Sequence, residues 1–159
     1  MPNSIGLKTM LSNFIKIITL TFILLTLPAM TFADSKGNCS GWDKGSTYNR
    51  LYDYENRDMF RGYIKKIIKI KPMNGMSEGI GIIAEDCEDG EQVVVHLGPE
   101  SFVSPLIKDL VPGTMVKFYG VLVEIGGQYA YMCSKIQKDG DHQYKFRKPE
   151  NGTPLWAVK

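Results

Sequence analysis

The stretch VVVHLGPESFVSPLIKDLVPGTMVKFYG, residues 93–120, decides the fold class that the sequence predicts. It begins as a strand, because Val93, Val95 and Leu97 alternate with other residues and share one face. A glycine-proline pair then ends the strand, and apolar residues at helical spacing follow. A second proline-glycine pair precedes another strand-like run. We therefore expect a strand, a short helix and a strand, in this order.

Further strand-like segments lie on both sides of this stretch, separated by turns rich in glycine, proline and aspartate. Three strands, a short helix and two more strands is the chain order of an OB-fold barrel, in which the helix closes one end. The sequence therefore predicts an all-β, five- to six-stranded OB-fold-like barrel with one short helix between strands 3 and 4. The expected strands are 59–71, 80–87, 92–98, 113–125, 128–137 and 142–147.

Two of these strands have an interrupted alternation. Lys66 breaks the pattern of the first strand. In the fourth strand the apolar phase changes from Val116 and Phe118 to Val121, and Gly120 lies at the change. A glycine at such a position predicts a β-bulge that bends the strand around a barrel corner.

The N-terminus has the pattern of a secretory signal peptide over residues 1–33. Lys8 and Lys16 accompany an apolar core, and Thr31 and Ala33 lie at the −3 and −1 positions of a cleavage site. The apolar run is shorter than the roughly 20 residues of a membrane-spanning helix. We expect a periplasmic or secreted protein with no membrane attachment after cleavage; a retained anchor is the alternative.

The charge balance changes when this segment is removed. The chain has 19 Lys+Arg and 17 Asp+Glu. Residues 1–33 contain two lysines and no acidic residue, so the rest has 17 of each sign. Nucleic-acid binding, which favours a basic domain, is not expected. We expect an irregular, aromatic N-terminal arm at 34–58 and the barrel domain at 59–159.

Three cysteines remain in the exported part: Cys39, Cys87 and Cys133. In an oxidising compartment two of them are expected to pair. Cys87 with Cys133 is the favoured pair because both lie in strand-like segments, but the sequence does not choose between the pairings. No Cys-x-x-Cys spacing occurs, so a metal site is not expected.

Aromatic and methionine side chains are the candidate ligand-binding or partner-binding residues. The aromatic rings of the arm either complete the core, together with Trp156, or stack on a ligand. The methionines lie in a glycine-rich loop, where flexible apolar side chains suit recognition but a plain connector is the alternative. The candidates are Trp42, Tyr48, Tyr52, Met73, Met76 and Phe102.

His96 is the further candidate, because it lies inside a predicted strand and out of phase with its apolar neighbours. An exported histidine can bind copper, iron or heme, with Met73 and Met76 as soft neighbours. The alternative is a hydrogen-bonded structural histidine, and we favour it because no second ligand lies at metal-binding spacing.

Five further segments are YNRLYD, RGYIKKI, HLGP, PGTMVKFYGV and KFRKPENGTPLW, which span about residues 48–156. Together they resemble a family of small exported bacterial proteins with an OB-like domain. A related domain is found in magnetosome-associated proteins. The family usually carries Trp-Tyr after HLGP, where this chain has only Phe102. The resemblance implies an OB-like fold and export, and no reaction.

The sequence contains no catalytic signature, since neither Gly-x-Ser-x-Gly nor a neighbouring Cys–His pair occurs. We therefore expect a non-enzymatic binding module, without catalytic residues, metal or cofactor, for an envelope protein or a small ligand. A metal- or heme-associated accessory protein of an electron-transfer or iron system is the alternative. A nucleic-acid-binding OB domain is less favoured.

Overall fold

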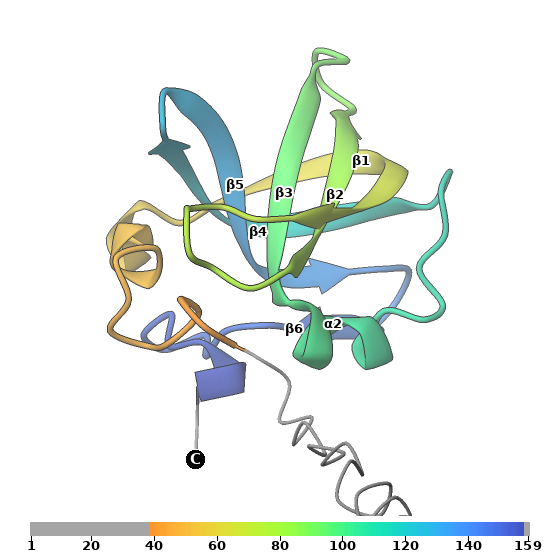
Figure 1. The fold of residues 1–159 in the computed structure, drawn as a ribbon. Helices are drawn as coiled ribbons and strands as arrows, with labels where there is room; N and C mark the ends of the chain where they lie inside the picture. Colours follow the sequence, from red (N-terminus) through yellow and green to blue (C-terminus); the bar gives the residue numbers. More distant parts are fainter. Residues whose placement is uncertain (1–38, 158–159) are drawn as a thin grey trace, which may run out of the picture. The chain divides into compact units, whose positions relative to one another are not determined.

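Six strands form a sheet that closes on itself in the computed structural model, which describes residues 39–157 (Figure 1). The predicted signal peptide and the start of the expected arm lie outside the described residues. No helix within residues 39–157 is long and apolar enough to cross a membrane. The elements are η1 (Asn49–Leu51), η2 (Tyr54–Asn56), β1 (Asp58–Ile70), β2 (Gly79–Asp86), β3 (Gln92–Pro99), α2 (Glu100–Leu106), β4 (Met115–Ile125), β5 (Gln128–Gln137), β6 (Gln143–Lys145) and η3 (Leu155–Ala157).

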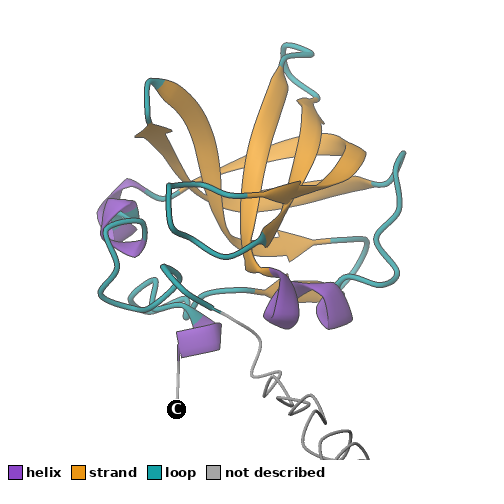
Figure 2. Ribbon diagram, viewed as in Figure 1, coloured by secondary structure: helices purple, strands orange, loops and turns teal. Residues whose placement is uncertain are grey.

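The sheet closes through a contact between β3 and β5. Antiparallel pairing gives the order β3-β2-β1-β4-β5-β6. A short parallel contact, Val95 with Tyr131 and His96 with Met132, then joins the two strands that complete the ring. The β6 strand pairs with β5 outside this ring. An all-β fold of five to six strands with one short helix between the third and fourth is therefore confirmed (Figure 2).

Both predicted irregularities occur. The register of β1 against β2 shifts between Ile64 and Lys66, and the register of β4 against β5 shifts between Tyr119 and Gly120. A residue inserted on one strand of an antiparallel pair increases the local twist and bend, which a small closed sheet requires. The bulge predicted at Gly120 from the apolar phase is thus confirmed.

The Gly120 bulge also divides the apolar residues of β4 between two clusters. Val116 and Phe118 belong to the main core inside the closed sheet. Val121 and Val123 belong to a second cluster, which the N-terminal arm covers. The change of phase therefore reflects two buried surfaces, one on each side of the strand.

The helix α2 lies across the end of the closed sheet at which β3 ends (Figure 1). Val103, Ile107 and Leu110 are buried in the main core. Leu106, an apolar residue of the same helix, is exposed. The helix has only seven residues, and Pro105 inside it removes one backbone N–H donor.

Gly98 lets the chain turn from β3 into this helix. Its φ is +152°, and a Cβ atom there would lie 2.7 Å from the Trp156 ring. The strand exit therefore needs glycine for its backbone angle and for the close approach of the C-terminal segment.

Candidate functional site

The N-terminal arm and the C-terminal segment meet on the second cluster. Trp42 is fully buried, and its ring contacts Tyr48 edge-on at 5.0 Å and Trp156 at 6.0 Å between centroids. The Trp156 indole Nε1–H donates to the Trp42 carbonyl at 2.7 Å. Trp42 and Tyr48 therefore close the core, and neither ring offers a free face to a ligand.

The other apolar candidates lie around this cluster. Met76 is buried in it, and Met73 packs against it. Phe102 of α2 contacts Trp156 edge-on at 5.7 Å. Tyr52 is half-buried, packs against the same cluster and also lines a cleft described below. The structure thus brings these predicted residues together as packing, and Tyr52 is the one that also lines a cleft.

His96 lies under the arm, next to Tyr48. It is 8% exposed, and its Nδ1 is 3.2 Å from the Tyr48 hydroxyl. Burial lowers the pKa of His96 to about 4 and raises the pKa of Tyr48, so the hydrogen bond joins a neutral imidazole and a protonated phenol. Residues 39–157 contain no group of three His, Cys, Asp or Glu side chains placed to hold a metal. This geometry favours the structural role for His96.

We expect the burial of His96 to make stability depend on pH. An unfolded histidine titrates near 6.5, above the folded pKa of about 4, so the unfolded chain binds the proton first. The stability from neutral His96 is complete above about pH 6.5 and is lost as the pH falls toward 4. Between pH 7 and 4.5, the free energy of unfolding in urea should fall by roughly 2 kcal/mol more than in His96→Gln. Parallel pH curves would contradict this.

The predicted Cys87–Cys133 disulfide is not formed. All three cysteines are free; Cys87 is exposed in the turn after β2, whereas Cys133 faces the main core from β5. The Cys133 thiol donates to the Lys135 carbonyl at 3.3 Å. Burial raises the pKa of Cys133 to about 12, so this thiol stays protonated.

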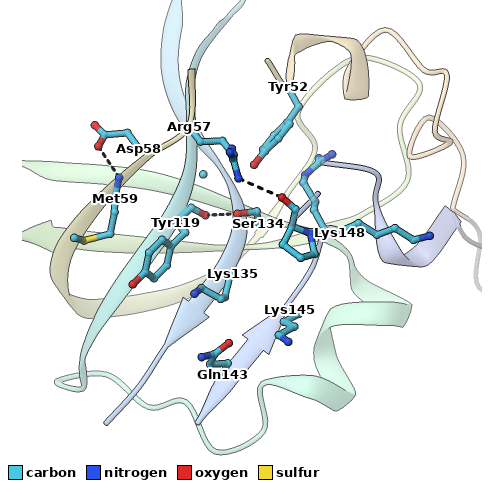
Figure 3. Close-up of a pocket in the computed structure, with 13 residues that line it drawn as sticks. Tyr52, Arg57, Asp58, Met59, Tyr119, Ser134, Lys135, Gln143, Lys145 and Lys148 are labelled. Atoms are coloured by element: carbon cyan, nitrogen blue, oxygen red, sulfur yellow. Dashed lines mark hydrogen bonds between the residues drawn. The ribbon is translucent and has the colours of Figure 1, made fainter. Parts of the chain in front are cut away.

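A cleft of about 510 Å³ lies between the start of β1, the bulged part of β4 and β5, and the C-terminal segment. Figure 3 shows Tyr52 and Arg57 at one end of the cleft and Lys135, Gln143 and Lys145 at the other. We name this site the basic cleft. Its charged residues are the five cations Arg57, Lys135, Lys145, Arg147 and Lys148, and one carboxylate, Asp58.

The cations of the basic cleft form no ion pair within the described part of the chain. None of the four ion pairs found within residues 39–157 includes one of these five cations. Arg57 donates to the carbonyls of Tyr54 at 2.8 Å and Pro149 at 3.2 Å, and Lys135 lies 3.8 Å above the Tyr119 ring. The Asp58 carboxylate accepts from the Met59 backbone N–H. The cleft therefore favours an anion.

Arg147 is the buried member of this set, with 3% of its surface exposed. Its Nη1 donates to the Gly152 carbonyl at 3.2 Å and its Nη2 to the Asn49 side-chain oxygen at 2.8 Å. The guanidinium carbon lies 4.5 Å from the centroid of the Tyr52 ring and 5.2 Å from that of Trp156. Burial lowers the pKa of Arg147, yet a guanidinium remains charged. Burying a charged guanidinium without a counter-ion lowers the stability of the fold.

Sequence reasoning missed the basic cleft. Arg57 lies far from the C-terminal residues in the chain, and the equal count of acids and bases hides a local excess. The one available signal was the cluster of Lys145, Arg147 and Lys148 in the motif KFRKPENGTPLW. The same motif carries part of the resemblance to the family.

A comparison with protein families shows which family this chain belongs to. The model of the MamS/MamX magnetosome protein family matches residues 56–143. The chain belongs to this family. The relation to magnetosome-associated proteins that the motifs predicted is therefore confirmed. Nothing among curated proteins or solved structures matches the chain.

The MamS/MamX match covers only part of the basic cleft. It includes Arg57 and the cleft residues of β1, β4 and β5, among them Lys135. It stops at residue 143, before Lys145, Arg147 and Lys148, and it begins after Tyr52. The matched region therefore supplies strands β1 to β5, and the segments outside it supply the remaining charges and the Tyr52 ring.

Proposed function

We propose that this MamS/MamX-family chain is an exported, non-catalytic binding module whose basic cleft takes an anionic ligand. One observation carries the proposal: five cations and a single carboxylate line a cleft of about 510 Å³. Sites for small ligands typically have volumes of about 300–1,000 Å³ and a few well-placed polar groups. Export rests on the signal-peptide pattern of residues 1–33.

The charge distribution supports a small anion over an extended polyanion. The described surface outside the cleft carries acidic residues, including the turn between β2 and β3 with Glu88, Asp89 and Glu91. The whole exported part has no net charge. A nucleic acid is better matched by a protein with a basic excess over a wide surface. Attraction confined to one cleft suits a compact ligand.

The test is a charge-neutralising double variant, Lys135→Gln with Lys145→Gln. Pyrophosphate and citrate are the probes, and binding is measured by calorimetry at low ionic strength. We expect a dissociation constant about tenfold higher than in the wild type, because each partly exposed charge contributes up to about 1 kcal/mol. Added salt should weaken binding to the wild type.

The matched control is Lys44→Gln with Lys66→Gln. It makes the same change in net charge at two exposed lysines that do not line the basic cleft. Its dissociation constant should stay within about twofold of the wild type. The proposal fails if neither probe binds the wild type, or if the control double variant weakens binding as much as the cleft variant does.

A further inference from the structure

Two polar atoms in the wall of the basic cleft have no hydrogen-bond partner. They are the Nε of Arg147 and the hydroxyl oxygen of Tyr52, and both are buried. No other buried side-chain nitrogen or oxygen of residues 39–157 lacks a partner. Burial raises the pKa of Tyr52, and an interaction with the Ser134 hydroxyl acts to lower it. Within residues 39–157, however, the Tyr52 hydroxyl has no hydrogen-bond partner at normal distance and angle, and the Ser134 hydroxyl donates to the Tyr119 carbonyl at 3.0 Å. Unpaired buried polar atoms are rare in folded proteins, so two in contacting residues require an explanation.

The two unpaired atoms belong to neighbouring side chains. The Arg147 guanidinium lies 4.5 Å from the centroid of the Tyr52 ring. One offers an N–H and the other an O–H, so an oxygen atom of a single anionic group can accept from both. The other hydrogen bonds of Arg147 go to neutral oxygens, of Asn49 and Gly152, and leave its charge uncompensated.

We propose that Arg147 and Tyr52 form the anchor of the basic cleft, and that they bind one carboxylate or phosphate group of a small ligand with at least two such groups. This inference rests on the proposed function. The anchored group accepts from Arg147 Nε–H and from the Tyr52 hydroxyl as the half-buried ring turns aside. A second anionic group then lies among Lys135, Lys145 and Lys148 at the exposed end of the cleft.

The geometry also explains why the ligand needs two charged groups. A single group on the anchor would satisfy Arg147 and leave the cluster of lysines without a counter-ion. A single group on the lysines would be exposed to solvent and screened, and would leave the buried guanidinium unpaired. Pyrophosphate and citrate should therefore bind at least about tenfold more tightly than acetate, which carries one group.

Tyr52→Phe is the decisive variant, because it removes only the unpaired hydroxyl. We expect it to weaken the binding of pyrophosphate or citrate about fivefold, the usual effect of one lost hydrogen bond. Its melting temperature should be equal to that of the wild type or higher, since an unpaired buried hydroxyl does not stabilise the fold. Tyr54→Phe, in the same arm but outside the cleft, is the matched control and should bind as the wild type does.

Arg147 is observed directly by NMR in isotope-labelled protein, through the resonance of its Nε–H group. A buried Nε–H gives a resolved signal, which should move during titration with pyrophosphate or citrate and saturate with the same dissociation constant as the calorimetric binding. The comparison of the two probes distinguishes a phosphate ligand from a carboxylate ligand. Acetate should move the signal only at concentrations at least about tenfold higher.

Failure of the anchor and failure of the proposed function give different experimental results. If either probe binds while the Arg147 signal stays fixed, or while Tyr52→Phe binds as tightly as the wild type, the anchor is wrong and the basic cleft remains a ligand site. If neither probe binds the wild type, both proposals are wrong. If Tyr54→Phe loses affinity as Tyr52→Phe does, the effect comes from the arm and the anchor is also wrong.

Discussion

Replacing Trp42 by alanine should lower the free energy of unfolding by about 3–5 kcal/mol, the usual cost of removing a large buried aromatic ring. Trp42 is fully buried at the centre of the second cluster. Its indole Nε1–H donates to the Ser77 carbonyl at 3.1 Å, and its ring contacts Tyr48 and Trp156. Alanine would leave a cavity at the place where both ends of the described chain pack together.

Urea denaturation measures this loss, and the fluorescence of Trp156 reports on its location. The chain has two tryptophans, so Trp156 is the single fluorophore of this type in the variant. Its emission should shift to longer wavelength in the folded state, because the ring loses its buried neighbour. The control is Leu122→Ala on β4, where the side chain is 58% exposed and the expected change is within about 0.5 kcal/mol. A loss below about 1 kcal/mol in Trp42→Ala would show that the arm does not stabilise the fold.

Gly120→Val should destabilise the protein by about 3 kcal/mol or more, which is at the upper end for overpacked sites. A Cβ atom at Gly120 would overlap the Met132 carbonyl oxygen, and it would lie 3.0 Å from the Cys133 Cα. Both atoms belong to the backbone of β5, which is held by pairing with β4 and β6 and cannot move aside as a side chain would. The bulge would therefore have to open.

The melting temperature is the measurement for Gly120→Val, and we expect a decrease on the order of 10 °C. Gly45→Ala is the control, because a Cβ at Gly45 has no atom within 4 Å. That control should change the melting temperature by less than about 2 °C. A Gly120→Val protein that melts with the wild type would mean that β4 and β5 pair without this bulge.

The order of the elements was predictable from local patterns. Alternating apolar residues and Asp-Gly or Gly-Gly turns defined the strands to within a few residues, as the agreement of 128–137 with β5 shows. The glycine at a change of phase identified the bulge at Gly120. These signals lie within about ten residues of each other, so neighbouring side chains alone determine them.

The candidate site was only partly predictable. Tyr52 was named among the aromatic candidates, but its partners were not, because Arg57, Lys135 and Arg147 come from segments separated by many residues. The expected Cys87–Cys133 bond shows the same difficulty, since two strand-like positions gave no information on which way each side chain faces. Equal numbers of acidic and basic residues concealed a cleft where one sign predominates.

The sequence by itself determined an all-β chain of five or six short strands, a helix between the third and fourth, and the position of a bulge, because each depends on residues close together in the chain. The tertiary structure alone decided that β3 meets β5, that Trp42 and Trp156 meet over a second core, and that Arg147 is buried without a counter-ion beside Tyr52. Contacts between distant segments depend on how the strands close and on which faces remain uncovered. Patterns of neighbouring residues do not predict how the strands close. The basic cleft forms only where the closed sheet brings distant segments together.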